Sequence, residues 1–414
     1  MFHRSVTGKM VKPSQEPGPI AGGVGGANRS GRATRAAGAT AMLAGKRPYR
    51  AAVIGRTGRG DYGHGLDLAL LNQPALTVVA VADESEKGRA AAAKRLGVDR
   101  AYADYREMLD REKPEFVSVA PRWVDCHRDM VTACAERGIH VFCEKPLAPD
   151  LASADAIVTA CERSHVKLAV AFQTRYSPRY ERVKELVESG AIGELLELRG
   201  RGKEDRRGGG EDLLVLGPHL MDLFRGFLGE ASTCYARVTE RGKPVGRAEV
   251  RSGAEGLGPL AGDRIDAVFH FARTPTSAYF ATARPAAGAS ERFGLLICGS
   301  KGVISLGTGW VPPAFLLASP DWTGASRGAK WQAITSAGLG RPETLPGNNL
   351  TEANRLIVAD LIRAVETDTQ PRSSVYDGRA SLEMLLACFA SHAQGGPVAI
   401  PLTARAKHPL ESLT

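Results

Sequence analysis

Several features that would assign a protein class are missing from this chain. Its seven cysteines are widely spaced and form no C-x-x-C pair, so neither a disulfide framework nor a cysteine-rich zinc site is expected. No two histidines have H-E-x-x-H spacing, and we predict no structural or catalytic metal. The longest uncharged stretch, residues 302–320, is interrupted by glycines and prolines, which argues against a transmembrane helix.

The excess of positive charge is concentrated at one end of the chain. The formal net charge is +9, but residues 1–50 hold nine Lys or Arg and only Glu16 as an acid. The rest is nearly neutral and lacks the basic face that nucleic-acid binding needs, so we expect no nucleic-acid partner. Residues 1–48 are poor in large apolar side chains, which predicts a disordered basic tail; a targeting extension is the alternative.

The same observations bear on the compartment. No apolar run follows the basic start of the chain, although a secretory signal requires one. Scattered cysteines in odd number fit a reducing environment. We therefore predict a cytoplasmic protein without a membrane partner.

From residue 49 onward, short apolar runs alternate with amphipathic stretches, as in a parallel sheet with crossover helices. Because the apolar runs are continuous, both faces of the sheet should be covered, which indicates an α/β, doubly wound Rossmann domain over 49–171. The expected strands are 51–55, 76–83, 115–121, 139–146 and 167–176. The expected helices are 62–74, 86–97, 126–138 and 153–165.

The loop after the first strand, GRTGRGDYG, is rich in glycine. Gly58, Gly60 and Gly63 have G-x-G-x-x-G spacing, and Gly55 ends the strand. Glycines at such a site let a pyrophosphate approach the backbone where free N–H groups favour an anion. We therefore expect a nicotinamide dinucleotide at this edge. The residues expected to bind it are Gly55, Thr57, Gly58, Arg59, Gly60, Pro121, Glu144 and Lys145.

Asp83 ends the second strand, 23 residues beyond Gly60. A carboxylate there would accept hydrogen bonds from the ribose hydroxyls and repel a 2′-phosphate, so NAD is favoured over NADP. Asp83 could instead be an ordinary helix N-cap, and Ser85 or Lys87 could still accommodate NADP.

The segment CEKPLA places Glu144 and Lys145 where a strand leaves the sheet, on the side where such folds bind ligands. A lysine there can transfer a proton if burial or a nearby cation lowers its pKa. An exposed Glu–Lys pair is the alternative.

The second half contains strand-like segments at 195–202, 232–240, 264–271, 276–282 and 292–298 after a helix near 181–189. Between the first two, leucines form a helical stripe, and His219 lies one step off it. Asp222 follows three residues later, so it could orient the imidazole. A core histidine is the alternative. Two amphipathic helices, 350–368 and 377–396, and a last strand, 395–401, close this half before an extension over 402–414.

Six ordered pieces resemble the Gfo/Idh/MocA oxidoreductases: the glycine loop, AVAD, HRDMVTACAERGIHVFCEKPLA, the block from AFQTRY to ELRG, GPHLMDL and CGSKGVISL. The resemblance implies a Rossmann domain followed by an α+β domain over 172–401, with a large open, mainly antiparallel sheet. It also implies that Lys145 is the catalytic lysine and His219 a catalytic or substrate-orienting histidine. The chain departs from the family at Val215, where an acid is common, and in its longer glycine loop.

The resulting hypothesis is hydride transfer between NAD, with NADP as the alternative, and a secondary alcohol of a sugar, cyclitol or related polyol. Lys145 or His219 would take the hydroxyl proton, with Asp222 as a third catalytic residue. Arg175, Tyr176, Asp212 and His219 are the candidate substrate contacts. A homo-oligomer, dimer or tetramer, is expected. A family glycosidase that uses NAD transiently and a non-catalytic NAD-binding sensor are the alternatives.

Overall fold

The computed structural model describes residues 47–284, 292–326, 328–347 and 349–413. The expected basic tail, residues 1–48, lies almost wholly outside them. The first sheet is parallel, with strand order β3-β2-β1-β4-β5-β6, which is the doubly wound arrangement and confirms the predicted Rossmann fold. Its strands are β1 (Tyr49–Ile54), β2 (Leu76–Ala82), β3 (Ala101–Tyr102), β4 (Phe116–Val119), β5 (His140–Cys143) and β6 (Leu168–Val170).

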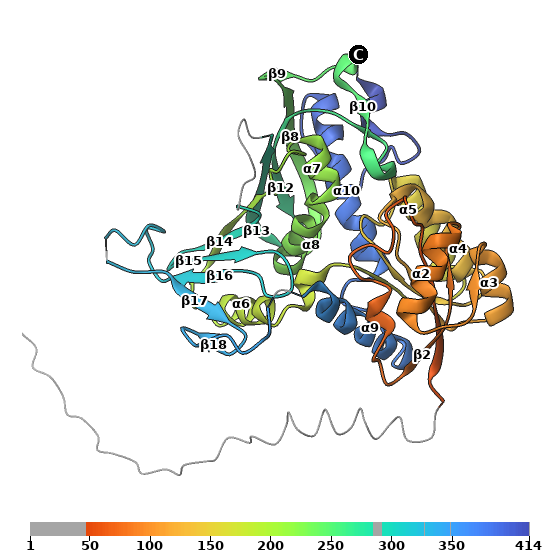
Figure 1. Cartoon of the computed structure of the whole chain (residues 1–414). Coiled ribbons are helices and arrows are strands. Elements are labelled where there is room, and N and C mark those ends of the chain that lie inside the picture. Colours follow the sequence, from red (N-terminus) through yellow and green to blue (C-terminus); the bar gives the residue numbers. More distant parts are fainter. Residues whose placement is uncertain (1–46, 285–291, 327, 348, 414) are drawn as a thin grey trace, which may run out of the picture. The chain divides into compact units, whose positions relative to one another are not determined.

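Helices connect these strands (Figure 1). Every residue of β4 is buried, because helices cover both faces of the sheet. The strand β3 and the helix after it were not anticipated from the sequence. The helices are α2 (Glu86–Leu96), η2 (Val124–Cys126), α3 (Tyr105–Glu112), α4 (His127–Ala135) and α5 (Leu151–Arg163).

The helix predicted over 62–74 is wrong. Only one short turn forms there, η1 (Leu68–Leu70). Gly63, Gly65 and Asn72 have φ angles of +60°, +78° and +60°, which lie outside the right-handed helical region. The glycine loop is therefore followed by irregular backbone, and no helix N-terminus faces the ligand edge at this point.

The second sheet has strand order β18-β17-β16-β15-β14-β7-β13-β12-β8-β19, with β9 paired to β8. Among the described strands of this sheet, only β7 and β13 pair in parallel, so the predicted mainly antiparallel sheet is confirmed. The strands are β7 (Leu195–Arg201), β8 (Ala231–Glu240), β9 (Lys243–Pro244), β12 (Arg264–Phe271), β13 (Thr274–Ala283), β14 (Gly294–Gly299), β15 (Val303–Gly307), β16 (Ala314–Leu317), β17 (Gln332–Thr335), β18 (Gly338–Leu339) and β19 (Val398–Ala399).

Helices and one small hairpin accompany this sheet (Figure 1). Pro218 stands in the first turn of α8 and breaks the expected leucine stripe into two helices, because proline cannot continue α7. The helical segments are η3 (Gln173–Tyr176), α6 (Pro178–Glu188), α7 (Gly210–Val215), α8 (Gly217–Leu228), η4 (Arg247–Glu249), η5 (Ala254–Gly256), α9 (Leu350–Glu366), α10 (Val375–Gln394) and η6 (Pro409–Ser412). The hairpin pairs β10 (Arg251–Ser252) with β11 (Pro259–Leu260).

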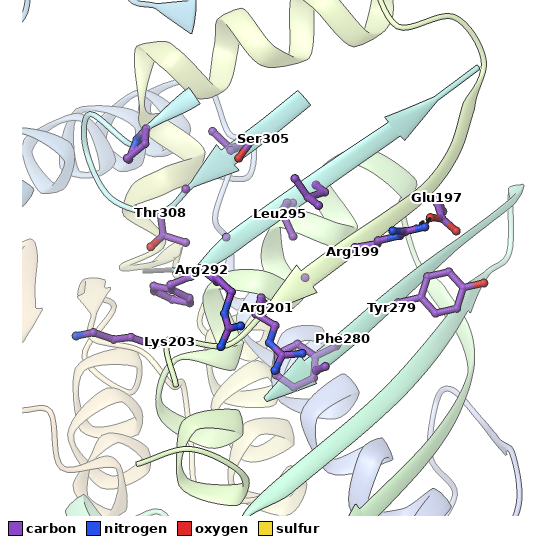
Figure 2. Close-up of a pocket in the computed structure, with 18 of the residues that line it drawn as sticks. Glu197, Arg199, Arg201, Lys203, Tyr279, Phe280, Arg292, Leu295, Ser305 and Thr308 are labelled. Carbon is purple, nitrogen blue, oxygen red and sulfur yellow. Dashed lines mark hydrogen bonds and ion pairs between the residues drawn. The ribbon is translucent and has the colours of Figure 1, made fainter. Parts of the chain in front are cut away.

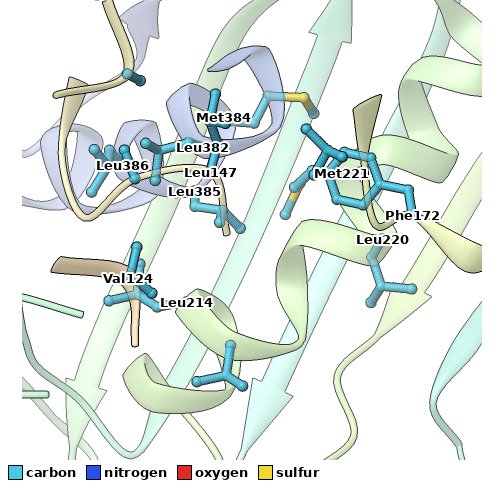
Figure 3. Close-up of a cluster of buried hydrophobic side chains, with 14 of the residues drawn as sticks. Val124, Leu147, Phe172, Leu214, Leu220, Met221, Leu382, Met384, Leu385 and Leu386 are labelled. Carbon is cyan, nitrogen blue, oxygen red and sulfur yellow. The ribbon is translucent and has the colours of Figure 1, made fainter. Parts of the chain in front are cut away.

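One hydrophobic core runs between the two sheets. Figure 3 shows Val124 and Leu147, from the first sheet's connections, beside Leu214 of α7 and Leu385 of α10. All four side chains are buried. This apolar contact fixes the carboxyl edge of the parallel sheet against the helices that carry the second half's polar residues.

The outer edge of β6 is closed by a late part of the chain. Val170 donates its backbone N–H to the carbonyl of Ser373 at 2.7 Å, and Ala169 forms a bridge with Ser374. Ser374 then begins α10 with a capping box that includes Asp377, a pattern that stabilises a helix start. None of the described helices is long and apolar enough to cross a membrane.

Candidate active site

Lys145 lies two residues beyond β5, at the carboxyl end of the parallel sheet. It is only 6% exposed, and its Nζ donates a hydrogen bond to the carbonyl oxygen of Val215 at 3.1 Å. Val215 is the last residue of α7, and the next helix carries His219. The amine therefore meets the α7–α8 junction directly.

Burial lowers the pKa of Lys145, because removal from water disfavours the ammonium form. The charges of Glu144 and Glu255 act in the opposite direction, and those of Arg207 and Arg122 add to the lowering. The net result is an amine that gives up its proton more easily than a free lysine. A group of this kind can serve as a general base near neutral pH.

Glu144 is completely buried, and both of its carboxylate oxygens have polar partners. Its Oε1 contacts Nδ1 of His64, and its Oε2 accepts a hydrogen bond from the backbone N–H of Lys145 at 2.7 Å. Burial alone would raise the pKa of Glu144, but the charge and hydrogen bond of His64, with the charge of Lys145, outweigh it and leave the pKa at about 2. Glu144 is therefore an anion at neutral pH.

The glycine before His64 makes this contact possible. A Cβ on Gly63 would lie 2.6 Å from the carbonyl oxygen of Ala120 and 2.8 Å from Cγ of Glu144. The carbonyl of His64 accepts a hydrogen bond from Asn354 at 3.0 Å, and Asn354 accepts one from Gln173 at 3.0 Å. A buried polar chain thus joins the glycine loop to η3.

His219 stands in the first turn of α8 and is half-buried. Its ring lies edge-on to Phe172 and Phe293, with centroids 6.2 and 6.4 Å away. Burial, and then the charge of Lys145, lowers the pKa of His219 to about 3, so the imidazole is neutral at physiological pH. Among the described residues, no hydrogen bond reaches the ring, which leaves both nitrogens available to a ligand.

The glycine loop folds into a tight turn closed by a bridge between Arg56 and Asp61. Gly58 and Gly60 have φ angles of +83° and +88°, which favour glycine. A Cβ on Gly58 would meet no atom within 4 Å, whereas one on Gly60 would lie 2.3 Å from the backbone nitrogen of Arg122. The loop therefore packs closely on one neighbour and leaves open space at Gly58.

Two arginines beside this loop contain buried nitrogen atoms without hydrogen-bond partners among the described residues: Nε of Arg122, and Nε of Arg56, which lies 3.6 Å from a carboxylate oxygen of Glu84. Arg56 follows Gly55, and the backbone N–H of Arg122 donates to the carbonyl of Gly60 at 3.4 Å. Buried guanidinium N–H groups require acceptors, and phosphate oxygens supply them. The loop and its arginines therefore fit the phosphates of a dinucleotide.

Two models of one protein family match this chain. The first, described as an oxidoreductase family with an NAD-binding Rossmann fold, matches residues 49–172, and the second, the GFO/IDH/MocA C-terminal domain, matches residues 180–305. Together they span more than half of the chain. The chain belongs to the GFO/IDH/MocA oxidoreductase family. Its first sheet is accordingly the family's NAD-binding Rossmann fold.

Curated relatives match parts of the chain. Levoglucosan dehydrogenase of Pseudarthrobacter phenanthrenivorans is 30% identical over 257 residues, which are 56% of this chain and 65% of the relative. Myo-inositol 2-dehydrogenase of Thermotoga maritima is 33% identical over 148 residues, 35% of this chain and 43% of the relative. The chain therefore spans less than two thirds of the length of these relatives.

Solved structures share the fold along most of the chain. Levoglucosan dehydrogenase in complex with NADH and L-sorbose superposes with a TM-score of 0.69 at 22% identity, covering 86% of this chain and all of that one. An oxidoreductase from Agrobacterium radiobacter in complex with NAD+, L-tartaric acid and magnesium gives a TM-score of 0.64 at 21% identity, covering 85% of this chain and 98% of that one.

Not every residue expected at the site of this GFO/IDH/MocA protein faces it. Arg175 donates to the carboxylate of Asp222 at 3.0 Å and to the carbonyl of Arg372. The hydroxyl of Tyr176 donates to Asp360 at 2.9 Å. No hydrogen bond joins Asp222 to His219, although the structure describes both residues, so Asp222 is placed as the partner of an arginine.

Four further expected residues have specific surroundings. Asp83 is 2% exposed and bonded by the glycine loop itself. Arg59 lies over the ring of Trp123, 5.1 Å from its centroid, and the carbonyl of Pro121 accepts a hydrogen bond from His127 at 2.7 Å. Asp212 is fully buried; its Oδ2 accepts from Thr282 at 2.5 Å, and its Oδ1 has no partner among the described residues.

A separate cavity of about 1050 Å³ lies on the other face of the second sheet (Figure 2). Its charged lining is largely paired, since Arg199 contacts Glu197 and Arg201 contacts Glu204. Lys145, His219 and the glycine loop do not line it. Phe293, which contacts His219, does line it, so the cavity borders the candidate active site without containing its candidate catalytic residues.

Sequence reasoning missed His64, Tyr62 and Glu255. Their contacts link segments far apart in the chain, such as His64 with Glu144, and no spacing rule announces them. The one available signal for His64 was its place directly after a loop glycine. In the part of the chain that the structure describes, no group of three or more His, Cys, Asp or Glu side chains could hold a metal.

Proposed function

We propose that this protein is a dehydrogenase that oxidises a secondary alcohol of a sugar, cyclitol or related polyol with NAD. The observation that carries the proposal is the buried amine of Lys145, bonded to Val215 beside the helix of His219. The curated relatives named as inositol and levoglucosan dehydrogenases support the substrate class.

A bound nicotinamide ring supplies the acceptor for the hydride of the alcohol carbon. Lys145, in its neutral form, accepts the hydroxyl proton. Glu144 fixes the backbone of Lys145 through the 2.7 Å hydrogen bond to its N–H. His219 is neutral because its pKa is low. Its imidazole donates a hydrogen bond to a substrate hydroxyl, or accepts one from it, and so orients the reacting carbon. General base catalysis of this kind contributes about 10²–10⁴-fold.

We favour NAD over NADP because Asp83, an acid, directly follows β2, where the adenosine ribose binds in Rossmann folds. A 2′-phosphate there would meet negative charge. Parallel titrations with NADH and NADPH, followed by nicotinamide fluorescence, measure this preference directly. Tighter binding of NADPH would contradict it.

The main test compares the parent with Lys145→Ala. We expect the parent to form NADH with at least one member of a panel of aldoses, cyclitols and other polyols. The variant should lose about 10²–10⁴-fold in kcat/KM while its NADH affinity stays the same. Lys94→Ala, at an exposed position on α2, should match the parent.

Other outcomes point to other functions. Tight NAD binding with glycoside cleavage and no net NADH would indicate a glycosidase. Tight binding with neither reaction would indicate a sensor, and no binding of either nicotinamide dinucleotide would reject the proposal.

We also propose that the chain forms a homo-oligomer through the outer face of the second sheet. Strand register places Tyr235, Tyr279, Leu296 and Phe315 on one cross-strand row. These side chains are 37–51% exposed, and exposed apolar rows of this kind favour protein contacts. Light scattering should show a dimer or tetramer, and Tyr279→Glu should dissociate it. A monomeric parent would contradict the proposal.

We propose a cytoplasmic location because the cysteines are unpaired. All seven are free thiols, and six are buried, which fits a reducing compartment. Fractionation of the native source should find the protein with cytosolic markers.

A further inference from the structure

The carboxylate of Asp83 is fully engaged by its own chain. Oδ1 accepts from the backbone N–H of Ser85 at 2.9 Å, and Oδ2 accepts from the hydroxyls of Thr57 and Tyr62 at 2.6 and 2.9 Å. The backbone N–H of Thr57 lies 3.1–3.2 Å from both oxygens. A carboxylate has about four lone-pair sites, so none is left for a ligand.

Tyr62 reaches Asp83 by packing across the start of the glycine loop. Its ring lies against Gly55, where an added Cβ would be only 2.2 Å from the ring. The guanidinium of Arg95 covers the ring at 4.7 Å from its centroid, and Arg95 in turn pairs with Asp67 at 2.7 Å. Tyr62 is only 9% exposed. The side chain is thus held between Gly55, directly after β1, and Asp83, directly after β2.

Thr57 approaches Asp83 from the other side of the loop. A Cβ on Gly88, in the first turn of α2, would lie 1.9 Å from the Thr57 hydroxyl and 3.0 Å from Oδ2 of Asp83. Thr57 and Tyr62 together present two hydroxyl donors to a single carboxylate oxygen. The vicinal hydroxyls of a ribose present the same donors.

We propose that Tyr62 competes with the ribose of the dinucleotide for Asp83, and so sets the affinity of this chain for the cofactor. The inference rests on the proposed use of a nicotinamide dinucleotide. When the dinucleotide binds, the ribose hydroxyls replace the hydroxyl of Tyr62, and then that of Thr57, on Oδ2. The hydrogen bond to Tyr62 is lost in this exchange, so part of the binding free energy is spent on opening the loop.

The test is the affinity of Tyr62→Phe for NADH, measured by titration of nicotinamide fluorescence. The substitution removes one hydroxyl and keeps the ring against Gly55. Because the unbound state loses a charge-assisted hydrogen bond and the bound state loses nothing, NADH should bind about tenfold more tightly, or about 1.4 kcal/mol. Association should also be faster, since fewer hydrogen bonds must break first. NADH should raise the melting temperature of the variant more than that of the parent.

The matched control is Tyr102→Phe. Tyr102 lies in the same fold and donates to a carboxylate, that of Glu112, at 2.6 Å. Its removal should leave NADH affinity unchanged. Thr57→Val removes the second hydroxyl and tests the same exchange if Tyr62→Phe does not fold.

Unchanged or weaker NADH binding by a folded Tyr62→Phe would overturn the inference while the proposed function stands, provided that the parent binds NADH. If Tyr62→Phe does not fold, the same result with Thr57→Val overturns it. If the parent fails to bind and Tyr62→Phe binds, the competition is confirmed in its strongest form. If parent and variants all fail to bind either dinucleotide, the proposed function and the inference both fall.

Discussion

Nδ1 of His64 and Oε1 of Glu144 are in direct contact between the glycine loop and the strand end that carries Lys145. The glutamate is fully buried, while the side chain of His64 is 37% exposed. A buried carboxylate needs such a partner, because an uncompensated charge in the interior is costly. The pair therefore links the glycine loop to the backbone segment that carries Lys145.

A double-mutant cycle measures this coupling. His64→Ala should destabilise the protein by about 2 kcal/mol, less than a fully buried pair would, because water reaches part of the imidazole. Glu144→Gln in the same background should recover part of the loss, since the orphaned charge is removed. Urea unfolding gives the four free energies. Additive effects of the two substitutions would show that the contact contributes nothing.

The rate should depend on pH through Lys145. In the proposed mechanism oxidation requires the neutral amine, so kcat/KM should rise with pH through the pKa of Lys145, which burial lowers. Glu255 raises that pKa and pairs with Arg122 at 3.7 Å. In Glu255→Gln the rising limb should therefore move to lower pH.

Glu240→Gln provides the comparison for Glu255. Glu240 pairs with Arg251 in the same segment of the second half and is not among the charges that shift Lys145. Its pH profile should coincide with that of the parent. If the rising limb of the pH profile moves to higher pH in Glu255→Gln, or stays in place, the electrostatic role of Glu255 is contradicted.

Alanine substitutions at two loop glycines distinguish the stability cost of backbone strain from that of a steric clash. Gly58→Ala introduces a Cβ at a positive φ into open space and should cost about 1–2 kcal/mol. Gly63→Ala adds the same strain and also forces a Cβ against Ala120 and Glu144, so we expect a loss of about 3 kcal/mol or more. Equal losses in thermal unfolding would show that both the backbone at Ala120 and the side chain of Glu144 move aside freely.

We expect Asp222 to stabilise the folded protein and to have little direct effect on turnover. Asp222→Asn leaves the guanidinium of Arg175, 16% exposed, with a neutral partner, and should cost about 2–3 kcal/mol in urea unfolding. Turnover of the folded variant should change less than about fivefold, since Asp222 makes no hydrogen bond to His219. A large fall in kcat with unchanged stability would instead assign Asp222 to the orientation of His219.

The sequence was sufficient for the parts of the fold that depend on periodicity. The buried strands of the first sheet and the helices α9 and α10 follow from their apolar patterns. The strand expected over 167–176 is too long, because it ends at Val170 and Gln173–Tyr176 form η3. The segment after the glycine loop did not, because its apolar spacing suits a helix while Gly63, Gly65 and Asn72 adopt left-handed backbone. Spacing also suggested that Asp222 faces His219, but Arg175, 47 residues earlier, takes the carboxylate. Long-range pairing of this kind leaves no mark in local sequence.

The backbone pairing of β6 with Ser373 and Ser374 means that the first sheet is incomplete without the last third of the chain. A polypeptide cut after residue 172 would present the backbone groups of Leu168–Val170 as an open strand edge, which recruits other chains. During synthesis this edge likewise stays bare until residue 374 has left the ribosome. We therefore expect the excised Rossmann half to aggregate, and chaperones to engage the nascent chain until α10 docks.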